Sequence, residues 1–564
     1  MHEKLKQILI SAIGKAGYKV PAGFDFGPAE NEKFGDFSTN AALIIGKKAG
    51  ETPKDVAEKI VANIKDKNIK NTEIAGPGFI NFHMCPEFFW QELSEILKSG
   101  QEFGRGDKNH RQKILVEFIS ANPTGPLHIG NARGGPIGET LSNVLSWLGH
   151  EVGREFYVND AGSQIAKFGK TLAYYYIVKT DPNFRFPEDG YPGDYPKEVS
   201  EDIQKEHAVE IEALKDELLP EFFIKHGLEL TTRRIKDDIE LLGIKFDNFV
   251  YESDFLSSGK SQAIVNQLKE IGKTTDKEGA VWFTADESAS RRIDGDDKEN
   301  VLVRSDAEKS LTYFASDIAY HKDKFDRDFK KLIDIWGPNH HGHIARLKSA
   351  MAALGYDPKN LEIMLYQNVK LKKDGEVKQM GKRLGNFINI ADLVNKLKVP
   401  ADVFKFMIIS HSSSSILDFD LDLALEQSEK NPVYYLQYAY ARICSILRKA
   451  DKKVVEELEK IARGEVSAGM SEFTNLTDKK EIYLILKLAE FPEVLKKIES
   501  DFQIQALPHF ATKIAGGYHD FYSSNIVLSD DKKLTRSRLL LILATRNVLK
   551  ICLTLMGISA PEKM

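Results

Sequence analysis

The sequence predicts an α/β protein with three parts. A Rossmann-type domain, built on a parallel sheet and carrying an insertion, lies between an N-terminal α/β domain and a C-terminal all-helical domain. Three observations predict this fold. The chain has 564 residues, more than one hydrophobic core normally serves. Strand-like apolar runs alternate with helical patterns between about residues 111 and 395. Beyond about residue 430 the apolar spacing is helical, without a clear strand.

The expected boundaries follow from these changes of pattern. Residues 1–110 form the N-terminal domain, 111–395 the Rossmann-type domain, 396–430 a connecting segment and 431–564 the helical domain. Within the Rossmann-type domain, the strand candidates are 114–120, 153–158, 301–304, 331–336 and 361–369. A polar stretch at about 165–300, rich in proline, glycine and charge, interrupts them. We expect an insertion there, most of whose residues serve as surface.

The N-terminal domain combines helices with a strand. Leu5, Ile8 and Leu9 mark the apolar face of an amphipathic first helix. Residues 34–50 are typical of a loop that leads into a second helix, and residues 76–84 of a turn that leads into a strand. An RNA-contacting domain and a domain with only a packing role are equally compatible with these residues.

The segment from 114 to 135 carries the most informative pattern. An apolar strand, 114–119, ends in a loop that contains proline, glycine and His128, and a helical pattern follows as far as Gly149. Such a strand–loop–helix unit holds nucleotides, because the start of a helix offers unpaired N–H groups to phosphate. His128 can reach a phosphate oxygen, and Gly130 leaves room for a ligand. Pro136 cannot continue a helix begun at His128, so we expect a kink or a new helix at Pro136.

A second loop, residues 376–387, is basic and rich in glycine. Lys378, Lys382 and Arg383 lie between its glycines. Such a loop can close on a triphosphate and stabilise the charge that develops as pyrophosphate leaves. A solvated basic turn is the alternative, and the buried strand before the loop favours the catalytic interpretation.

Acidic side chains indicate a binding pocket for a cation. Glu117 lies in an otherwise apolar strand, where a carboxylate is costly to bury without a partner. Asp317 opens a helical run, with Tyr313 one turn upstream. Two carboxylates and a phenol at the carboxyl edge of a sheet suit a planar cation with several N–H donors. Asp317 as an ordinary acidic residue near a helix start is the alternative.

Metal binding by the protein is not expected. His340, His341 and His343 cluster in the segment 336–343, but no cysteine or carboxylate accompanies them. The three cysteines, Cys85, Cys444 and Cys552, form no close pair, which argues against disulfides and a cysteine zinc site. Residues 1–10 mix charges into an apolar pattern, unlike a secretory signal. Residues 539–558 are interrupted by charges and favour a core helix over a membrane span. We expect a cytoplasmic protein without membrane contact.

The helical domain offers a candidate RNA surface. Tyr434 and Tyr438 are four residues apart, opposite the apolar stripe of their helix, and Arg442 follows at the same spacing. Exposed aromatic rings at this spacing can stack on unpaired bases. Packing against a second helix is the alternative. A net charge of −5 means that any nucleic-acid contact depends on local basic patches.

These motifs resemble those of class I aminoacyl-tRNA synthetases. The string from 128 to 131, HIGN, resembles the HIGH signature, and SANPTGPLHIGNARG resembles its arginyl-tRNA synthetase form. Residues 379–383 resemble the KMSKS signature loosely. Residues 304–321 and 431–444 also resemble arginyl-tRNA synthetases, and the likeness runs from the first domain to the last residue. Asn131 departs from the pattern, since it replaces the second histidine and cannot carry charge.

The resemblance implies a function and a set of site residues. It implies an arginine–tRNA ligase that uses L-arginine, tRNA(Arg) and ATP with Mg²⁺ as substrates, has no tightly bound cofactor and acts as a monomer. It also implies that arginine activation waits for tRNA. The implied catalytic residues are His128, Asn131 and Lys382, and the ATP-binding residues are Pro123, Gly125, His128, Gly130, Asn131, Met380 and Lys382. The implied arginine-binding residues are Glu117, Asn122, Tyr313, Asp317 and His340. The implied tRNA-binding residues are Tyr434, Tyr438 and Arg442, in a domain that binds the anticodon.

Two other functions stay open at this point. A class I synthetase for another amino acid, such as lysine, would also use carboxylates like Glu117 and Asp317. A non-catalytic relative that binds tRNA would explain Asn131 and the loosely matching segment 379–383. Formation of an aminoacyl-adenylate distinguishes an enzyme from such a binding protein.

Overall fold

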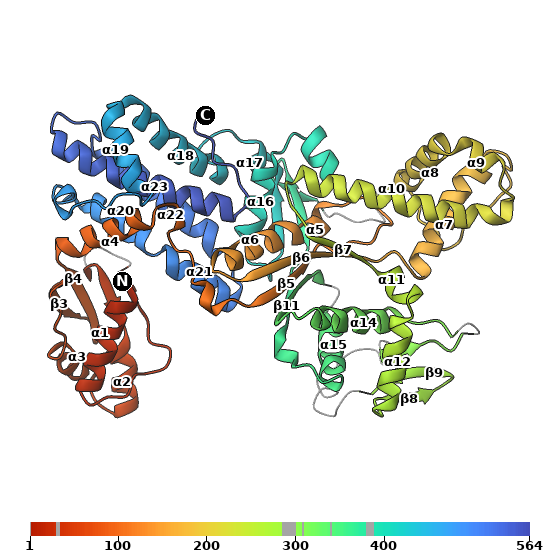
Figure 1. Ribbon diagram of the computed structural model, residues 1–564, viewed down its shortest axis with the longest axis horizontal. Coiled ribbons are helices and arrows are strands. Elements are labelled where there is room, and N and C mark those ends of the chain that lie inside the picture. The colour runs from red at the N-terminus through yellow and green to blue at the C-terminus, as the bar shows by residue number, and fades with distance from the viewer. Residues whose placement is uncertain (1, 30–33, 285–299, 307–308, 339–340, 379–387) are drawn as a thin grey trace.

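The computed structural model describes residues 2–29, 34–284, 300–306, 309–338, 341–378 and 388–564 (Figure 1). The N-terminal domain packs helices on an antiparallel sheet whose strand order is β1-β2-β4-β3. Thr52 caps one of these helices and Pro53 starts it, the usual way to begin a helix. The elements are α1 (His2–Lys15), β1 (Phe26–Pro28), β2 (Phe37–Thr39), α2 (Ala41–Ala49), α3 (Pro53–Val61), β3 (Ile69–Ala75) and β4 (Phe79–Met84).

Helix α4 (Pro86–Ser99) leads out of this domain and packs against helices of the C-terminal domain. The indole N–H of Trp90 donates to the carbonyl of Leu476, 3.0 Å away. The first and last parts of the chain therefore lie side by side (Figure 1).

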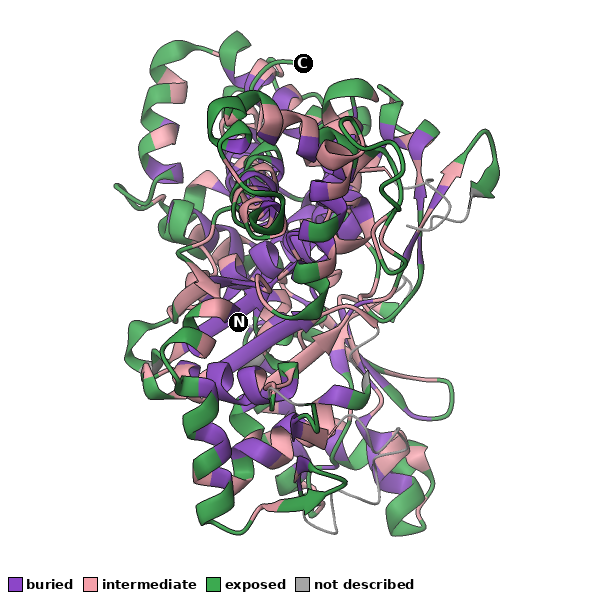
Figure 2. Ribbon diagram, turned by 90° about the vertical axis from the view of Figure 1, so that its right-hand side faces the viewer, coloured by how far each residue is buried: buried purple, intermediate pink, exposed green. Residues whose placement is uncertain are grey.

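The central domain contains the expected parallel sheet, five-stranded, in the order β12-β11-β5-β6-β7. Buried residues concentrate in this sheet and in the helices of the C-terminal domain (Figure 2). The register aligns Glu117 of β5 with Asp334 of β11. The strands are β5 (Lys113–Phe118), β6 (Glu151–Val158), β7 (Asn248–Tyr251), β11 (Lys331–Trp336) and β12 (Leu361–Leu365). The neighbouring helices are α5 (Ile129–Ala132), α6 (Gly134–Trp147), α14 (Tyr313–Asp326) and α15 (His341–Ala353).

The stretch expected as one insertion, 165–300, contributes a strand to the sheet. Helices α7 (Ser163–Ile177), α8 (Asp194–Glu206), α9 (Ala208–Glu212) and α10 (Leu219–Leu241) form a helical lobe before β7. After β7 come α11 (Glu252–Ser257), α12 (Lys260–Glu270), β8 (Thr274–Lys277), β9 (Ala280–Phe283) and β10 (Val301–Val303). Strand β10 belongs to a separate antiparallel sheet, β10-β9-β8. Our placement of 301–304 in the parallel sheet was therefore wrong, because an apolar run of this length does not reveal its partner strand.

The connecting segment contains a strand that the sequence did not indicate. Strand β15 (Leu417–Asp420) pairs in parallel with β13 (Val369–Lys373), and β14 (Glu376–Lys378) pairs antiparallel on the other side. Helices α16 (Ala401–Ile409) and α17 (Leu421–Leu425) flank β15. The polar stretch around 411–422 is thus tied to the strands that precede the basic loop.

The rest of the chain is all-helical, as expected. Its helices are α18 (Pro432–Lys449), α19 (Lys452–Ala462), α20 (Lys479–Ala489), α21 (Phe491–Asp501), α22 (Ala506–Ser524) and α23 (Lys532–Leu555). Helix α23 is buried along most of its length, which confirms it as a core helix. Among the described residues, no helix combines the length and apolar character needed to cross a bilayer.

Candidate active site

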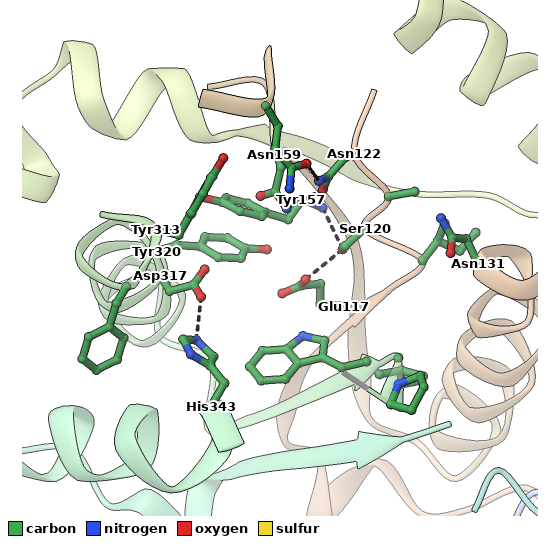
Figure 3. A pocket seen from close by; sticks show the side chains of 18 of the residues that line it. Glu117, Ser120, Asn122, Asn131, Tyr157, Asn159, Tyr313, Asp317, Tyr320 and His343 are labelled. Carbon is green, nitrogen blue, oxygen red and sulfur yellow. Dashed lines mark hydrogen bonds and ion pairs between the residues drawn. The ribbon is translucent and has the colours of Figure 1, made fainter. Parts of the chain in front are cut away.

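A cavity of about 1310 Å³ opens at the carboxyl ends of β5, β6 and β11 (Figure 3). Parallel α/β sheets bind ligands at this edge, because the strand ends and the loops that follow them converge there. The volume is ample for an amino acid and a nucleotide together. Its lining includes Glu117, Ser120, Asn122, Thr124, His128, Gly130, Asn131, Tyr157, Asn159, Gln164, Tyr313, Asp317, Tyr320, His321, Trp336, His343 and Arg346.

The loop after β5 turns sharply into the short helix α5, and the longer helix α6 follows. Ile119 and Ser120 adopt positive φ angles of 68° and 44°, which end the strand. Helix α5 stops at Ala132 and α6 starts at Gly134. The helix is therefore interrupted at Arg133, three residues before Pro136 rather than at it, directly after Ala132, whose carbonyl the proline ring would meet in a continuous helix.

His128 lies at the start of α5 with its ring folded back on the backbone. Its Nδ1 accepts hydrogen bonds from the N–H groups of Gly130 and Asn131, at 3.1 and 3.2 Å. The neutral ring therefore carries its proton on Nε2. A Cβ at Gly130 would lie 3.1 Å from this ring, so a side chain at this position would crowd the imidazole. His128 is thus fixed as a hydrogen-bond donor in the wall of the cavity.

Arg133 fastens this loop to the strands that lead to the basic loop. Its guanidinium is fully buried and donates to the carbonyls of Gln367, Ser412 and Ser415, at 2.7–3.0 Å. Burial lowers the pKa of Arg133 to about 10. These bonds fix α5 relative to the start of β13 and to the connecting segment. Arg133 therefore ties the His128 loop to residues 367 and 412–415.

Glu117 belongs to a buried charge cluster beneath the cavity. The ammonium of Lys324 lies between Glu117 and Asp334, 2.8 Å from Asp334 Oδ1, and His321 Nε2 is 2.7 Å from Asp334 Oδ2. Ser120 Oγ donates to Glu117 Oε1 at 2.8 Å. The two carboxylates and the imidazole have the spacing of metal ligands. Lys324 already supplies their cation, so this cluster needs no metal ion.

The two carboxylates of this cluster differ in charge balance. Burial alone would raise the pKa of Asp334, but Lys324 and His321 lower it to about 2. Burial raises the pKa of Glu117, and Lys324 offsets this only in part. The charge of Asp334 is therefore balanced within the cluster, chiefly by Lys324. Glu117 lines the cavity, and a second cation there would stabilise its ionised form.

Asp317 and Tyr313 stand on the same face of α14, as their spacing predicted, on the other side of the cavity (Figure 3). His343 Nε2 lies 2.6 Å from Asp317 Oδ2, and Arg346 Nε donates to His343 Nδ1 at 2.7 Å. In the figure, the carboxylates of Asp317 and Glu117 both point into the cavity. Two acidic side chains from distant segments thus face one space.

Glu252, which the sequence analysis missed, is a third carboxylate at this end. It directly follows β7, is 3% exposed, and its Oε2 is buried without a hydrogen bond. Burial, with a contribution from the charge of Asp317, raises its pKa to about 8. Recognition of β7 in the sequence would have placed Glu252 at the carboxyl edge of the sheet.

An amide network completes the rim of the cavity. Asn159 Nδ2 donates to Asn122 Oδ1, and Asn122 Nδ2 donates to Gln164 Oε1, both at 2.9 Å. Asn122 was predicted, whereas Asn159 and Gln164 were not. The network links the loop after β5 to the loop after β6 and so orients polar groups around the opening.

Two predicted ATP-binding residues lie away from the cavity surface. Pro123 and Gly125 are not among its lining residues, and the carbonyl of Pro123 instead accepts a hydrogen bond from Thr231 Oγ1 of α10 at 2.7 Å. The hydrogen bond to Pro123 joins the loop to α10. Met380, Lys382 and His340 lie outside the described residues.

The predicted tRNA-binding residues share one face of α18. The rings of Tyr434 and Tyr438 are stacked at 6.4 Å, and Tyr438 is 41% exposed. Arg442 donates to Tyr522 Oη at 2.6 Å and lies over its ring. A second cavity, of about 450 Å³, borders Arg442, Lys449 and Tyr522. Tyr438 is thus open to solvent, on the same helix as the two basic residues that border the second cavity.

Comparison with known proteins identifies the family. Three family models match in succession, described as the arginyl tRNA synthetase N terminal domain at 3–84, the class I (R) tRNA synthetase catalytic domain at 92–401 and the DALR anticodon binding domain at 436–564. The chain is 39% identical over 561 residues to the arginine–tRNA ligase of Heliobacterium modesticaldum, a match that covers 99% of this chain and 96% of that protein. The chain belongs to the arginyl-tRNA synthetase family.

Further relatives match this chain over its full length. The arginine–tRNA ligase of Caldanaerobacter subterraneus is 37% identical over 571 residues, covering 100% of this chain and 98% of that protein. The fold matches that of the Thermus thermophilus arginyl-tRNA synthetase with a TM-score of 0.76 and 20% identity, covering 100% of both chains. The family model at 92–401 identifies the central domain as a class I synthetase catalytic domain, with Asn131 in place of the second signature histidine.

Proposed function

We propose that this synthetase is an arginine–tRNA ligase that activates L-arginine with ATP and transfers it to tRNA(Arg). The observation that carries the proposal is the pair of Asp317 and Glu252. Glu252 is buried, and repulsion from the charge of Asp317 adds to the burial that raises its pKa to about 8. A planar guanidinium with several N–H donors relieves that repulsion and supplies hydrogen bonds to both.

Arginine has a second cationic group, which Glu117 accommodates. We propose that the α-ammonium lies beside Glu117, the cluster member still short of positive charge. Glu117 and Asn122 are on the segment that leads to His128, so the arginine carboxylate then faces the nucleotide loop. Tyr313 closes the guanidinium end, together with Asp317 on the same helix. His340 stays a prediction.

The chemistry needs no protein nucleophile. An oxygen of the arginine carboxylate attacks the α-phosphate of ATP, forming a new P–O bond, and the bond to pyrophosphate breaks. The 2′-hydroxyl of the terminal adenosine of tRNA then attacks the acyl carbon, and AMP leaves with the bonding electrons. We propose that the Nε2–H of His128 and the amide of Asn131 hold phosphate oxygens, with Mg²⁺ entering as part of the ATP substrate. Positioning of the substrates and preorganised hydrogen-bond donors then accelerate the reaction.

We propose that tRNA binds across the helical domain. Tyr438 offers an exposed ring stacked on Tyr434, and Arg442 lies beside the 450 Å³ hollow. A base that leaves the anticodon stack could lie on these rings, with Lys449 near its phosphate. We further propose that the protein is cytoplasmic. We also propose that it acts as a monomer, since residues of a single chain make up the proposed arginine site.

The decisive experiment is ATP–pyrophosphate exchange with each of the twenty amino acids, with and without tRNA. We expect exchange with arginine alone, and only when tRNA is present. Exchange with lysine but not arginine would assign the protein to another substrate. Tight tRNA binding without any exchange would favour the non-catalytic alternative.

A further inference from the structure

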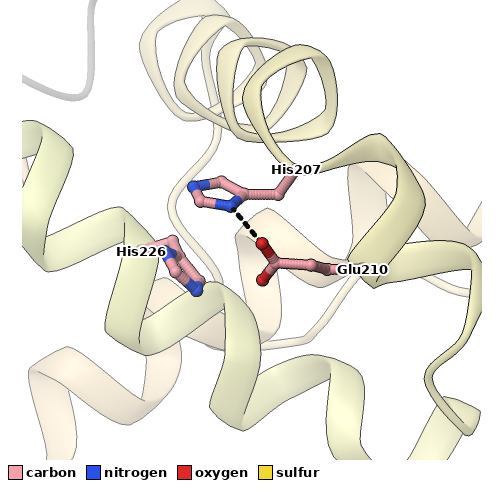
Figure 4. A group of neighbouring side chains, drawn as sticks. All are labelled: His207, Glu210 and His226. Atoms are coloured by element: carbon pink, nitrogen blue, oxygen red, sulfur yellow. Dashed lines mark hydrogen bonds and ion pairs between the residues drawn. The ribbon is translucent and has the colours of Figure 1, made fainter.

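Two histidines and a glutamate lie together in the helical lobe formed by α7–α10, among residues with no place in the arginine site. His207 stands at the junction of α8 and α9, Glu210 follows on α9, and His226 is on α10 (Figure 4). One candidate ligand atom of each lies within 4.8 Å of the other two. Figure 4 shows the three side chains directed toward one another from two segments of the lobe.

The two imidazoles are unusually close and do not serve one another as hydrogen-bond partners. Their ring centroids are 4.0 Å apart. His207 Nδ1 is 3.4 Å from Glu210 Oε1. Neutral imidazole is the form that binds metal ions.

One buried ring nitrogen of this group lacks a hydrogen-bond partner. The side chain of His226 is 10% exposed, and its Nδ1 is buried without a hydrogen bond. Glu229 Oε2 lies 3.2 Å from this nitrogen, outside hydrogen-bonding alignment. A buried polar atom without a partner costs roughly 1–3 kcal/mol, so its retention calls for a compensating ligand.

The surroundings resemble those of metal sites in their chemistry. Phe222 packs against the ring of His226, with centroids 4.3 Å apart, and shields one side. Glu210 is exposed, which leaves a route for an ion to enter and a position for water.

We propose that His207, Glu210 and His226 form a binding site for a divalent transition metal ion such as Zn²⁺. Two imidazoles and one carboxylate, with water in the fourth position, make a common zinc ligand set. Tetrahedral coordination at about 2.0–2.1 Å requires ligand atoms about 3.3 Å apart, so small side-chain rotations complete the site. The ion joins the α8–α9 junction to α10 and so stabilises the lobe. The site is distinct from the charge cluster beneath the active-site cavity, where Lys324 serves as the cation.

The test measures Zn²⁺ binding to the full-length, chelator-treated protein by equilibrium dialysis at micromolar metal. We compare the wild type with Glu210→Gln and His226→Gln. Glu212→Gln, on the same short helix, is the matched control for the carboxylate, and His509→Gln, an exposed histidine of α22, is the control for the imidazole. Co²⁺ absorption separates nitrogen and oxygen coordination from binding at the cysteines.

We expect one equivalent of metal to be lost in both cluster variants and retained in both controls. Metal should also raise the melting temperature of the wild type but not of Glu210→Gln. Unchanged stoichiometry in Glu210→Gln, or no binding to the wild type at micromolar metal, would overturn the proposal. If His226→Gln fails to fold, Glu210→Gln still decides the matter, because Glu210 is exposed and its amide variant should fold. Arginine-dependent pyrophosphate exchange in Glu210→Gln should equal that of the wild type.

Discussion

Replacement of Glu252 by glutamine should stabilise the free protein and impair its use of arginine. The stability effect follows from the proton balance. The pKa of this carboxyl rises from 4.5 to about 8 in the fold, chiefly through burial. Between these values the unfolded chain has released the proton, while the folded protein keeps it. Stability therefore falls as pH rises through this window, by about 1.4 kcal/mol per pH unit. The cost is absent below pH 4.5 and fully developed above about pH 8.

The size of the gain follows from the same difference. Glutamine has nearly the volume of glutamate and never ionises, so Glu252→Gln removes the cost of burying the charge. At pH 8 the free energy of unfolding should increase by on the order of 4 kcal/mol, and at pH 6 by about 2 kcal/mol. Because Glu252 is 3% exposed, solvent screening reduces these values little. Urea unfolding of the arginine-free protein at pH 5, 6 and 8 measures the effect.

The same substitution should weaken arginine binding, because glutamine cannot balance the guanidinium charge. A loss of about 3–5 kcal/mol corresponds to a KM for arginine raised roughly 10²- to 4 × 10³-fold. The wild type should bind arginine more tightly as pH rises from 6 to about 8 and then level off, since the ionised carboxyl is the binding form. Glu252→Gln should lack most of this pH dependence.

Asp254→Asn is the matched control, an exposed acidic residue on the same helix, α11. It should change neither the unfolding free energy nor the KM by a comparable amount. A Glu252→Gln protein that is no more stable than the wild type at pH 8 would refute the reasoning about the buried charge. A KM for arginine within about tenfold of the wild-type value, roughly 1.4 kcal/mol, would refute the assignment of Glu252 to the guanidinium.

Three further predictions concern charges around the cavity. Asp317→Ala should cost on the order of 3–5 kcal/mol of arginine affinity with little change in ATP binding, and a loss below tenfold would make Asp317 only a structural residue. Lys324→Met should lower the unfolding free energy by about 3–5 kcal/mol at pH 7, and adding Glu117→Gln should restore part of it; no restoration would argue against charge as the cause. Lys382→Ala should slow arginyl-adenylate formation about 10²–10³-fold in single-turnover assays, while the KM for arginine hardly changes. Lys378→Ala is the control. A greater loss of rate in Lys378→Ala would mean that Lys378, not Lys382, stabilises the leaving pyrophosphate.

The local parts of the site could be predicted because their signals are contiguous in the chain. The strand that ends at Phe118, the glycines and the break before Pro136 specify the loop that carries His128. Tyr313 and Asp317 share a face because their spacing is that of one helical turn. Backbone sterics and periodicity act over a few residues, so a sequence displays them directly.

The strand partners were not predictable in the same way. The runs at 301–304 and 417–420 are short, and their apolar content does not distinguish a parallel sheet from a separate hairpin. Strand β7 is only four residues long and lies within a polar stretch, so Glu252 was overlooked. The partner of a short strand is decided by packing, which involves residues far away in the chain.

The order of domains, the nucleotide loop and the acidic character of the pocket are all legible in the amino-acid sequence. The balance of charge in the pocket depends instead on the folded chain. Folding places Lys324, 207 residues after Glu117, between that carboxylate and Asp334. It also brings Glu252 close enough to Asp317 to raise its pKa. The physical reason is that burial and Coulomb interactions depend on distance in space, and chain spacing reports that distance only within a turn of helix or along a strand.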